Sequence, residues 1–169
     1  MSKAVKEKRV KAVPVWMGIA VFLLAFGAGA VSKTAIKPAW AKEYSAQWGG
    51  ALGTLKTDLP YGEGAANKFD LYLPAEGGKG SYGLVVYLHA GGFTTGDKTD
   101  DRDMLAWLCS KGYVAAGINY TLRDEAHPEA SVLTQSNEIK TAVPQVIQAA
   151  EQAGYPIGKM TVAGGSAGH

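Results

Sequence analysis

The 169-residue sequence contains one cysteine, Cys109, and therefore no internal disulfide. Cys109 lies in an apolar helical pattern, which favours a small buried side chain over a reactive thiol. Only three histidines are present and none stands in a cluster with cysteine, so we expect neither a metal site nor a cofactor. A basic stripe for nucleic acid is also missing, because five of the 17 basic side chains lie in the first eleven residues and the rest of the chain is mildly acidic.

Charge is absent from residues 12–31, an apolar run about as long as a helix needs to cross ~30 Å of hydrocarbon. Basic side chains precede this run, which predicts that they stay in the cytoplasm and that the following chain is exported. Two interpretations stay open. A-x-A patterns at 28–30 and 39–41 are typical of a cleaved signal peptide and a secreted product. The length of the run instead favours an uncleaved helix that anchors the protein in the cell membrane, facing outward.

The chain divides into a basic and apolar leader at 1–31, a tether at 32–50 and a globular body at 51–169. Hydrophobic periodicity in the body predicts strands at 52–59, 67–73, 84–88, 113–120 and 159–163, and helices at 100–111 and 131–153.

The first two strands are expected to form an antiparallel pair. The continuous apolar run at 84–88 is typical of a strand that is buried on both faces of a parallel sheet. From there the order is strand, helix, strand, helix, strand, which predicts an α/β fold with a mostly parallel, doubly wound sheet.

A glycine-rich pentapeptide, Gly164-Gly165-Ser166-Ala167-Gly168, follows the last expected strand. Its G-x-S-x-G spacing is that of a nucleophile elbow, a sharp strand-to-helix turn that exposes a serine hydroxyl at the top of a sheet. Side chains at Gly164 and Gly168 would collide with the neighbouring strand and helix, so both positions favour glycine. Ser166 is the candidate nucleophile. The alternative interpretation of the pentapeptide alone is a loop that only connects a strand to a helix.

A second motif, His89-Ala90-Gly91-Gly92, follows the buried strand at 84–88 and precedes a helix. Attack by a serine on a carbonyl creates a negatively charged oxygen, which backbone N–H groups stabilise. Glycines let a substrate approach such a backbone closely. We expect His89 to be a structural histidine that hydrogen-bonds the loop, because this kind of site delivers its base after the nucleophile in chain order.

Four segments in this order resemble the N-terminal half of a serine esterase or lipase of the α/β-hydrolase superfamily, in the hormone-sensitive-lipase-like or carboxylesterase group. They are Phe69 to Pro74, His89 to Phe93, Asn119 to Arg123, and Gly164 to Gly168. The resemblance implies an α/β-hydrolase fold, Ser166 as nucleophile, and an oxyanion hole built from the N–H groups of Gly91, Gly92 and Ala167. It also implies a small-molecule ester substrate, and a structural role for Asn119 to Arg123 in bracing the top of the sheet.

The family's acidic residue and catalytic histidine follow the nucleophile, and only three residues follow Ser166 here. We therefore expect a fold that is truncated after the elbow, with an incomplete catalytic triad. His127 precedes the elbow and is expected to be a solvated loop residue. The leading hypothesis is an exported carboxylic ester hydrolase; the alternatives are an inactive, degenerate hydrolase fragment tethered through residues 12–31, and an α/β-hydrolase peptidase.

Overall fold

The structure is a computed structural model that describes residues 19–20, 23 and 42–168. The chain divides after residue 42, and the described residues 43–168 form one compact unit. The apolar run predicted to cross a membrane, at 12–31, lies almost wholly outside the described residues. Within the part of the chain that is described, no helix has the length and apolar character needed to span a bilayer.

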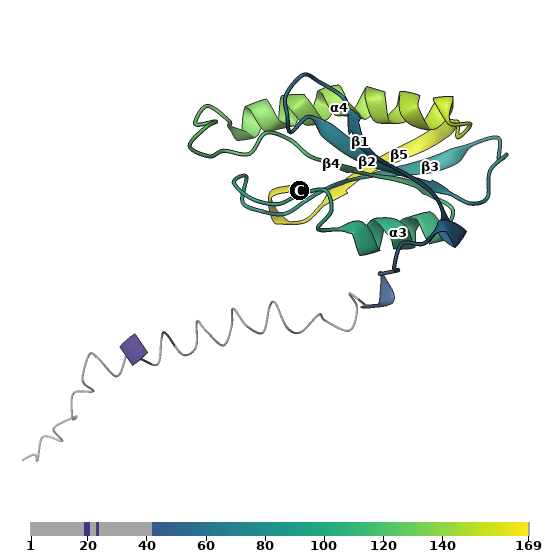
Figure 1. Ribbon diagram of the computed structural model, residues 1–169, viewed down its shortest axis with the longest axis horizontal. Coiled ribbons are helices and arrows are strands. Elements are labelled where there is room, and N and C mark those ends of the chain that lie inside the picture. Colours follow the sequence, from purple (N-terminus) through teal and green to yellow (C-terminus); the bar gives the residue numbers. More distant parts are fainter. Residues whose placement is uncertain (1–18, 21–22, 24–41, 169) are drawn as a thin grey trace, which may run out of the picture. The chain divides into compact units, whose positions relative to one another are not determined.

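Five strands of the second unit form one sheet in the order β1–β2–β4–β3–β5 (Figure 1). The strands are β1 (Gly53–Pro60), β2 (Lys68–Pro74), β3 (Tyr82–Leu88), β4 (Val114–Ile118) and β5 (Ile157–Gly164). As predicted, β1 and β2 pair antiparallel. β2 also pairs antiparallel with β4, whereas β3 pairs parallel with β4 on one side and with β5 on the other. The described sheet is therefore mixed rather than mostly parallel.

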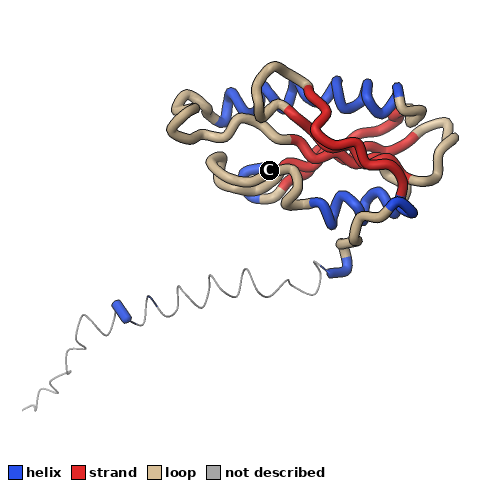
Figure 2. Tube along the Cα trace, viewed as in Figure 1, coloured by secondary structure: helices blue, strands red, loops and turns tan. Residues whose placement is uncertain are grey.

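Two helices cover opposite faces of this sheet, as Figures 1 and 2 show. They are α3 (Arg102–Ser110), which lies against β2 and β4, and α4 (Val132–Gln152), which packs on β2, β4 and β5. Each helix is followed by a glycine with positive φ, Gly112 at 85° and Gly154 at 89°. Glycine adopts this left-handed conformation without steric penalty, so it ends a helix readily. Both helices therefore end where the sequence predicts.

The core consists of one apolar cluster on each face of the sheet. The α4 face buries Phe69, Leu71 and Leu73 of β2 against Ala142 and Val146, among others. The α3 face buries Tyr72 and Ala115 against Leu105 and Cys109. Burial raises the pKa of the Cys109 thiol to about 11, which agrees with its predicted role as a small buried side chain.

β3 is buried less completely than its sequence suggests. Tyr82, Leu84, Val86 and Leu88 are buried on one face, but the alternate residues are only half-buried. The sequence of β3 is uniformly apolar because the strand contributes to both clusters. Helix α3, however, is nine residues long and covers mainly β2 and β4, so it leaves this face of β3 half-buried. The strand buried along its whole length is β4.

Residues at the end of the predicted tether contact the body. The Trp48 ring packs edge-on against Tyr72 at 5.1 Å, and the Tyr44 ring packs edge-on against Trp107 at 5.0 Å. The Ala46 N–H donates to the Asp103 carbonyl. Trp48 thus covers apolar surface on the α3 face of the sheet.

Candidate active site

The turn after β5 has the geometry of a nucleophile elbow. β5 ends at Gly164, and a short 3-10 turn, η2 (Ser166–Gly168), follows at once. Ser166 is exposed and has φ of 50°, a left-handed conformation that costs a non-glycine residue about 1–3 kcal/mol. A Cβ atom at Gly164 would fall on the Gly168 carbonyl, and one at Gly168 would fall on the Leu88 carbonyl. Only glycine fits at either position, so the motif spacing follows from close backbone approach.

The loop after β3, residues 89–96, contains four residues with positive φ. These are Gly91 at 144°, Gly92 at 60°, Phe93 at 71° and Gly96 at 107°. A Cβ atom at Gly91 would fall on the Thr95 carbonyl, and one at Gly96 would fall on the Ala90 carbonyl. The loop therefore folds back on itself in a conformation that requires these glycines.

Sheet register places this loop beside the elbow. Leu88 and Gly164 are opposite one another at the carboxyl ends of two parallel neighbours, β3 and β5. Both chains then leave the sheet at the same edge, and the Gly165 N–H donates to the Leu88 carbonyl at 3.3 Å. A Cβ atom built on Gly165 would lie 3.5 Å from the Ala90 Cβ. The segments that carry the four predicted site residues thus meet at one end of the sheet.

The peptide planes of the loop fix the direction of its N–H groups. No peptide bond of the described residues is cis, so each N–H points opposite to the carbonyl of the same peptide plane. The Gly91 carbonyl accepts hydrogen bonds from the Thr94 N–H at 3.1 Å, the Thr95 N–H at 3.0 Å and the Thr95 hydroxyl at 3.0 Å. The Gly92 N–H, which shares that peptide plane, therefore points away from the Thr94–Thr95 turn.

The same geometry applies one residue earlier in the loop. The Ala90 carbonyl lies 2.9 Å from His89 Nδ1, which assigns the ring proton to Nδ1. The Gly91 N–H, on the same peptide plane as the Ala90 carbonyl, then points the opposite way. Among residues 42–168, the N–H groups of Gly91, Gly92 and Ala167 have no hydrogen-bond acceptor. These are the three N–H groups for which the resemblance implies an oxyanion hole.

His89 is a structural residue, as the sequence predicts. Its side chain is buried, its ring stacks on that of Tyr120 at 4.5 Å, and its Nδ1 bonds the loop backbone. The Tyr120 hydroxyl in turn donates to the His89 carbonyl at 3.1 Å. The histidine therefore connects the loop after β3 to the segment after β4.

Asn119 braces the top of the sheet, in agreement with the role expected for residues 119–123. Its Oδ1 accepts from the Lys98 N–H at 2.6 Å, and its Nδ2 donates to Asp97 Oδ2 at 2.7 Å. Burial would raise the pKa of Asp97, but the hydrogen bonds from Asn119 and Thr99 outweigh this and lower it. Asp97 therefore remains an anionic acceptor that holds Asn119 in place.

Two residues of α4 that no sequence motif marks also hold this region. Gln135 Nε2 donates to the carbonyls of Phe93 at 3.0 Å and Thr121 at 2.9 Å. Glu138 accepts from the Thr121 N–H at 2.7 Å and from its hydroxyl at 2.8 Å. One signal could have identified Gln135, because it falls on the helical stripe of Ile139, Ala142 and Val146, where an apolar residue is expected.

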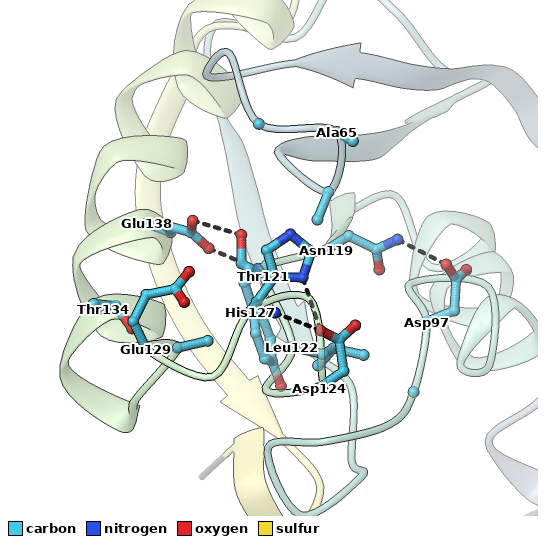
Figure 3. Close-up of a pocket in the computed structure, with 15 residues that line it drawn as sticks. Ala65, Asp97, Asn119, Thr121, Leu122, Asp124, His127, Glu129, Thr134 and Glu138 are labelled. Carbon is cyan, nitrogen blue, oxygen red and sulfur yellow. Dashed lines mark hydrogen bonds and ion pairs between the residues drawn. The ribbon is translucent and has the colours of Figure 1, made fainter.

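Two cavities lie near this end of the sheet. The larger, about 500 Å³, is lined by side chains that include Asp97, Asp124, His127 and Glu138 (Figure 3). His127 Nδ1 lies 2.9 Å from Asp124 Oδ1, and the His127 N–H donates to the same oxygen, which lowers the pKa of the Asp124 carboxyl. No residue of the elbow lines this cavity. His127 is half-exposed, as expected for a loop residue.

The smaller cavity, about 200 Å³, adjoins the elbow. Its walls include Phe93, Val132, Ile139, Val162 and Ala167. In residues 42–168 no side chain forms a hydrogen bond with the Ser166 hydroxyl, and no group of three or more histidine, cysteine or acidic side chains is placed to hold a metal ion.

Comparison with known families decides the classification. The sequence profile of the BD-FAE family matches residues 69–169, which include the loop after β3 and the elbow. The chain belongs to the BD-FAE family. It is thereby a member of the α/β-hydrolase esterase superfamily, which confirms the resemblance found in the sequence.

Individual relatives agree with this classification. Kynurenine formamidases from Danio rerio and Salmo salar are 29% and 30% identical over 91 residues, 54% of this chain. The chain spans only 29% of the length of these curated relatives.

Solved esterase structures share the fold of this BD-FAE member. Esterase B from Lactobacillus rhamnosis, inhibited with a tributyrin phosphonate, matches 93% of this chain and 48% of its own, with 23% identity and a TM-score of 0.62. Esterase 2 from Thermogutta terrifontis matches 69% of this chain and 41% of its own, with 23% identity and a TM-score of 0.56.

Proposed function

We propose that this BD-FAE protein hydrolyses small carboxylic esters with Ser166 as the nucleophile. The observation that carries the proposal is the position of the exposed Ser166, at positive φ, beside a loop with acceptor-free N–H groups. Strained, exposed nucleophiles and unpaired backbone donors cluster at sites of acyl transfer. The family assignment agrees with this reaction class.

In the proposed reaction, Ser166 Oγ forms a bond to the ester carbonyl carbon while the carbonyl π electrons move onto oxygen. The N–H groups of Gly91, Gly92 and Ala167 stabilise that oxyanion, each removal costing about 3–4 kcal/mol of transition-state stabilisation. A general base accepts the serine proton. When the oxyanion collapses back to a carbonyl, the bond between the carbonyl carbon and the alcohol oxygen breaks, and the base gives its proton to the departing alcohol. Water then hydrolyses the acyl-enzyme by the same route.

We further propose that the base is a histidine after the nucleophile in chain order, paired with an acidic residue. Neither histidine of residues 42–168 suits the role, because His89 is committed to the Ala90 carbonyl and His127 pairs with Asp124 away from the elbow. The proposed activity is therefore assayed with protein expressed from the complete coding sequence.

Amide hydrolysis is a second candidate, favoured by the similarity to the two kynurenine formamidases. A nucleophilic serine with an oxyanion hole attacks esters and amides through the same tetrahedral intermediate. Parallel assays on a short-chain aryl ester, an N-formyl arylamine and a peptide p-nitroanilide distinguish an esterase, a formamidase and a peptidase by their kcat/KM values. Activity on none of them favours the inactive alternative.

Replacing the nucleophile tests the proposal. We expect Ser166→Ala to lower kcat by about 10⁴-fold to 10⁶-fold and to leave the fold unchanged, as loss of a triad serine does elsewhere. Ser110→Ala is the matched control, because Ser110 is an exposed serine at the end of α3. Near-normal turnover by Ser166→Ala would show that another residue attacks the substrate.

We also propose that the body acts outside the cytoplasmic membrane, on the basis of the basic flank and the apolar run at 12–31. Alkaline phosphatase fused after residue 60 is expected to be active, because it needs the oxidising compartment to form its disulfides. A cytoplasmic reporter that is active at the same fusion point, with an inactive phosphatase fusion, would contradict export.

A further inference from the structure

We propose that Gln135 is a positioning residue that orients the Gly92 N–H for oxyanion binding. This inference rests on the proposed function. Among the described residues Gln135 forms no hydrogen bond with the elbow; it acts through two peptide planes that connect it to the loop.

The first step of this connection is the contact of Gln135 with the loop. Gln135 Nε2 donates to the Phe93 carbonyl at 3.0 Å and to the Thr121 carbonyl at 2.9 Å. The orientation of the side-chain amide follows from these partners, because a flipped amide would place Oε1 against two carbonyl oxygens. Oε1 is buried and has no partner among the described residues. The cost of burying it supports the view that the two donated bonds are needed here.

The second step passes through the Phe93–Thr94 peptide. The Phe93 carbonyl accepts from Gln135 and from the Arg123 N–H at 3.1 Å, and the Thr94 N–H of the same plane donates to the Gly91 carbonyl at 3.1 Å. The Gly91–Gly92 peptide then directs the Gly92 N–H away from the turn. Each bond sets the rotation of the next plane, so Gln135 lies at one end of a chain of oriented dipoles and the Gly92 N–H at the other.

Phe93 explains why this loop needs an external restraint. Its φ of 71° is unfavourable for a residue with a Cβ atom, by about 1–3 kcal/mol. Without the bond from Gln135, Phe93 can relax toward a negative φ. The Phe93–Thr94 peptide plane then rotates and turns the Gly91–Gly92 plane with it. Such a relaxation weakens binding of the charged transition state more than binding of the neutral substrate, because the N–H groups bind mainly the oxyanion.

The helix that carries Gln135 is well fixed at this end. Ser131 caps α4 by accepting the Thr134 N–H at 3.2 Å, and the Thr134 hydroxyl accepts the Ser131 N–H at 2.6 Å. One turn further, Glu138 holds Thr121. The side chain that reaches the loop therefore starts from a rigid helical turn.

The test is Gln135→Met, which keeps the length of the side chain and removes both donors. The protein is expressed from the complete coding sequence, and its active sites are counted by titration with a fluorophosphonate. Per titrated site, we expect kcat to fall about tenfold to 100-fold while KM changes less than about twofold. Inhibition by an aryl boronate, which forms a charged tetrahedral adduct, should weaken by the same factor as kcat. The Gly92 amide resonance should shift in the ¹⁵N–¹H spectrum.

Gln148→Met is the matched control, because Gln148 is exposed on the same helix and should change none of these readouts. If Gln135→Met does not fold, Gln135→Glu tests the same idea at equal volume, and it should lower kcat at least as much because a carboxylate faces two carbonyl oxygens. An unchanged kcat per titrated site would overturn the proposal. A rise in KM by the same factor as the loss of boronate affinity would also overturn it. Loss of activity in Ser166→Ala with none in Gln135→Met would refute this inference alone.

Discussion

Removal of the Lys98 charge is expected to destabilise the fold strongly. The Lys98 side chain is 6% exposed, and its Nζ lies 3.0 Å from Asp58 Oδ1 and 3.0 Å from Asp70 Oδ1. The Asp70 side chain is only 2% exposed. In Lys98→Met the buried Asp70 carboxylate keeps one described donor, the Asp58 N–H at 2.9 Å. Breaking one side of a buried pair costs about 3–5 kcal/mol, because the remaining charge has lost its counter-ion.

The assay is equilibrium unfolding in denaturant, with Lys140→Met as control. Lys140 is exposed on α4, and its replacement should change the free energy of unfolding by less than about 0.5 kcal/mol. The double variant Lys98→Met/Asp70→Asn should regain much of the loss, since no buried unpaired charge then remains and the Asp58 carboxylate is exposed. A loss below about 1 kcal/mol in Lys98→Met, or no recovery in the double variant, would refute the buried-charge argument.

The pH dependence of this difference has a defined sign. Burial would lower the pKa of Lys98, but hydrogen bonds and charge from Asp58 and Asp70 outweigh it, so the pKa is raised. A raised folded-state pKa contributes stability that is fully present below the ordinary lysine value of about 10.4 and is lost as pH rises through the folded value. On the alkaline side, the gap between wild type and Lys98→Met should therefore shrink as the pH rises through the folded-state pKa of Lys98.

Three further predictions concern the elbow, the thiol and the sheet edge. Gly168→Ala should abolish activity and lower stability, because the added methyl meets the Leu88 carbonyl; a wild-type melting temperature and kcat would contradict this. Cys109 should not react with a thiol reagent at pH 8 until the protein unfolds, because it is buried with a pKa of about 11; fast labelling of the native state would refute that. Residues 43–169 expressed alone should self-associate, since β5 is an edge strand of the described sheet with Val162 47% exposed, and Val162→Lys should reduce this self-association. A monomeric wild-type segment with a cooperative melting transition would contradict this prediction.

Local chemistry made much of the fold predictable. The elbow was recognisable because close backbone approach at Gly164 and Gly168 leaves glycine as the one residue that fits. Helix ends at Gly112 and Gly154 were predictable for a related reason, their positive φ. Periodicity located all five described strands of the sheet to within a few residues. β2, β3 and β4 bury side chains in the two apolar clusters, whereas β1 and β5 are largely exposed.

Long-range partners were not predictable in the same way. Lys98 reads as a solvated loop residue, yet it lies among carboxylates from β1 and β2. Gln135 looks like a flaw in an apolar stripe, and its partners lie 42 and 14 residues away in sequence. The half-buried face of β3 depends on how much of the sheet α3 covers. These features follow from the assembly of distant segments, which no local pattern encodes.

Covalent labelling tests the central claim most directly. The protein from the complete coding sequence is treated with a fluorophosphonate, digested, and analysed by mass spectrometry. We expect one adduct, on the peptide that contains Ser166, with labelling and esterase activity lost in parallel and no adduct in Ser166→Ala. A fully inactivated enzyme that carries its label on another residue would contradict the assignment of Ser166 as the nucleophile.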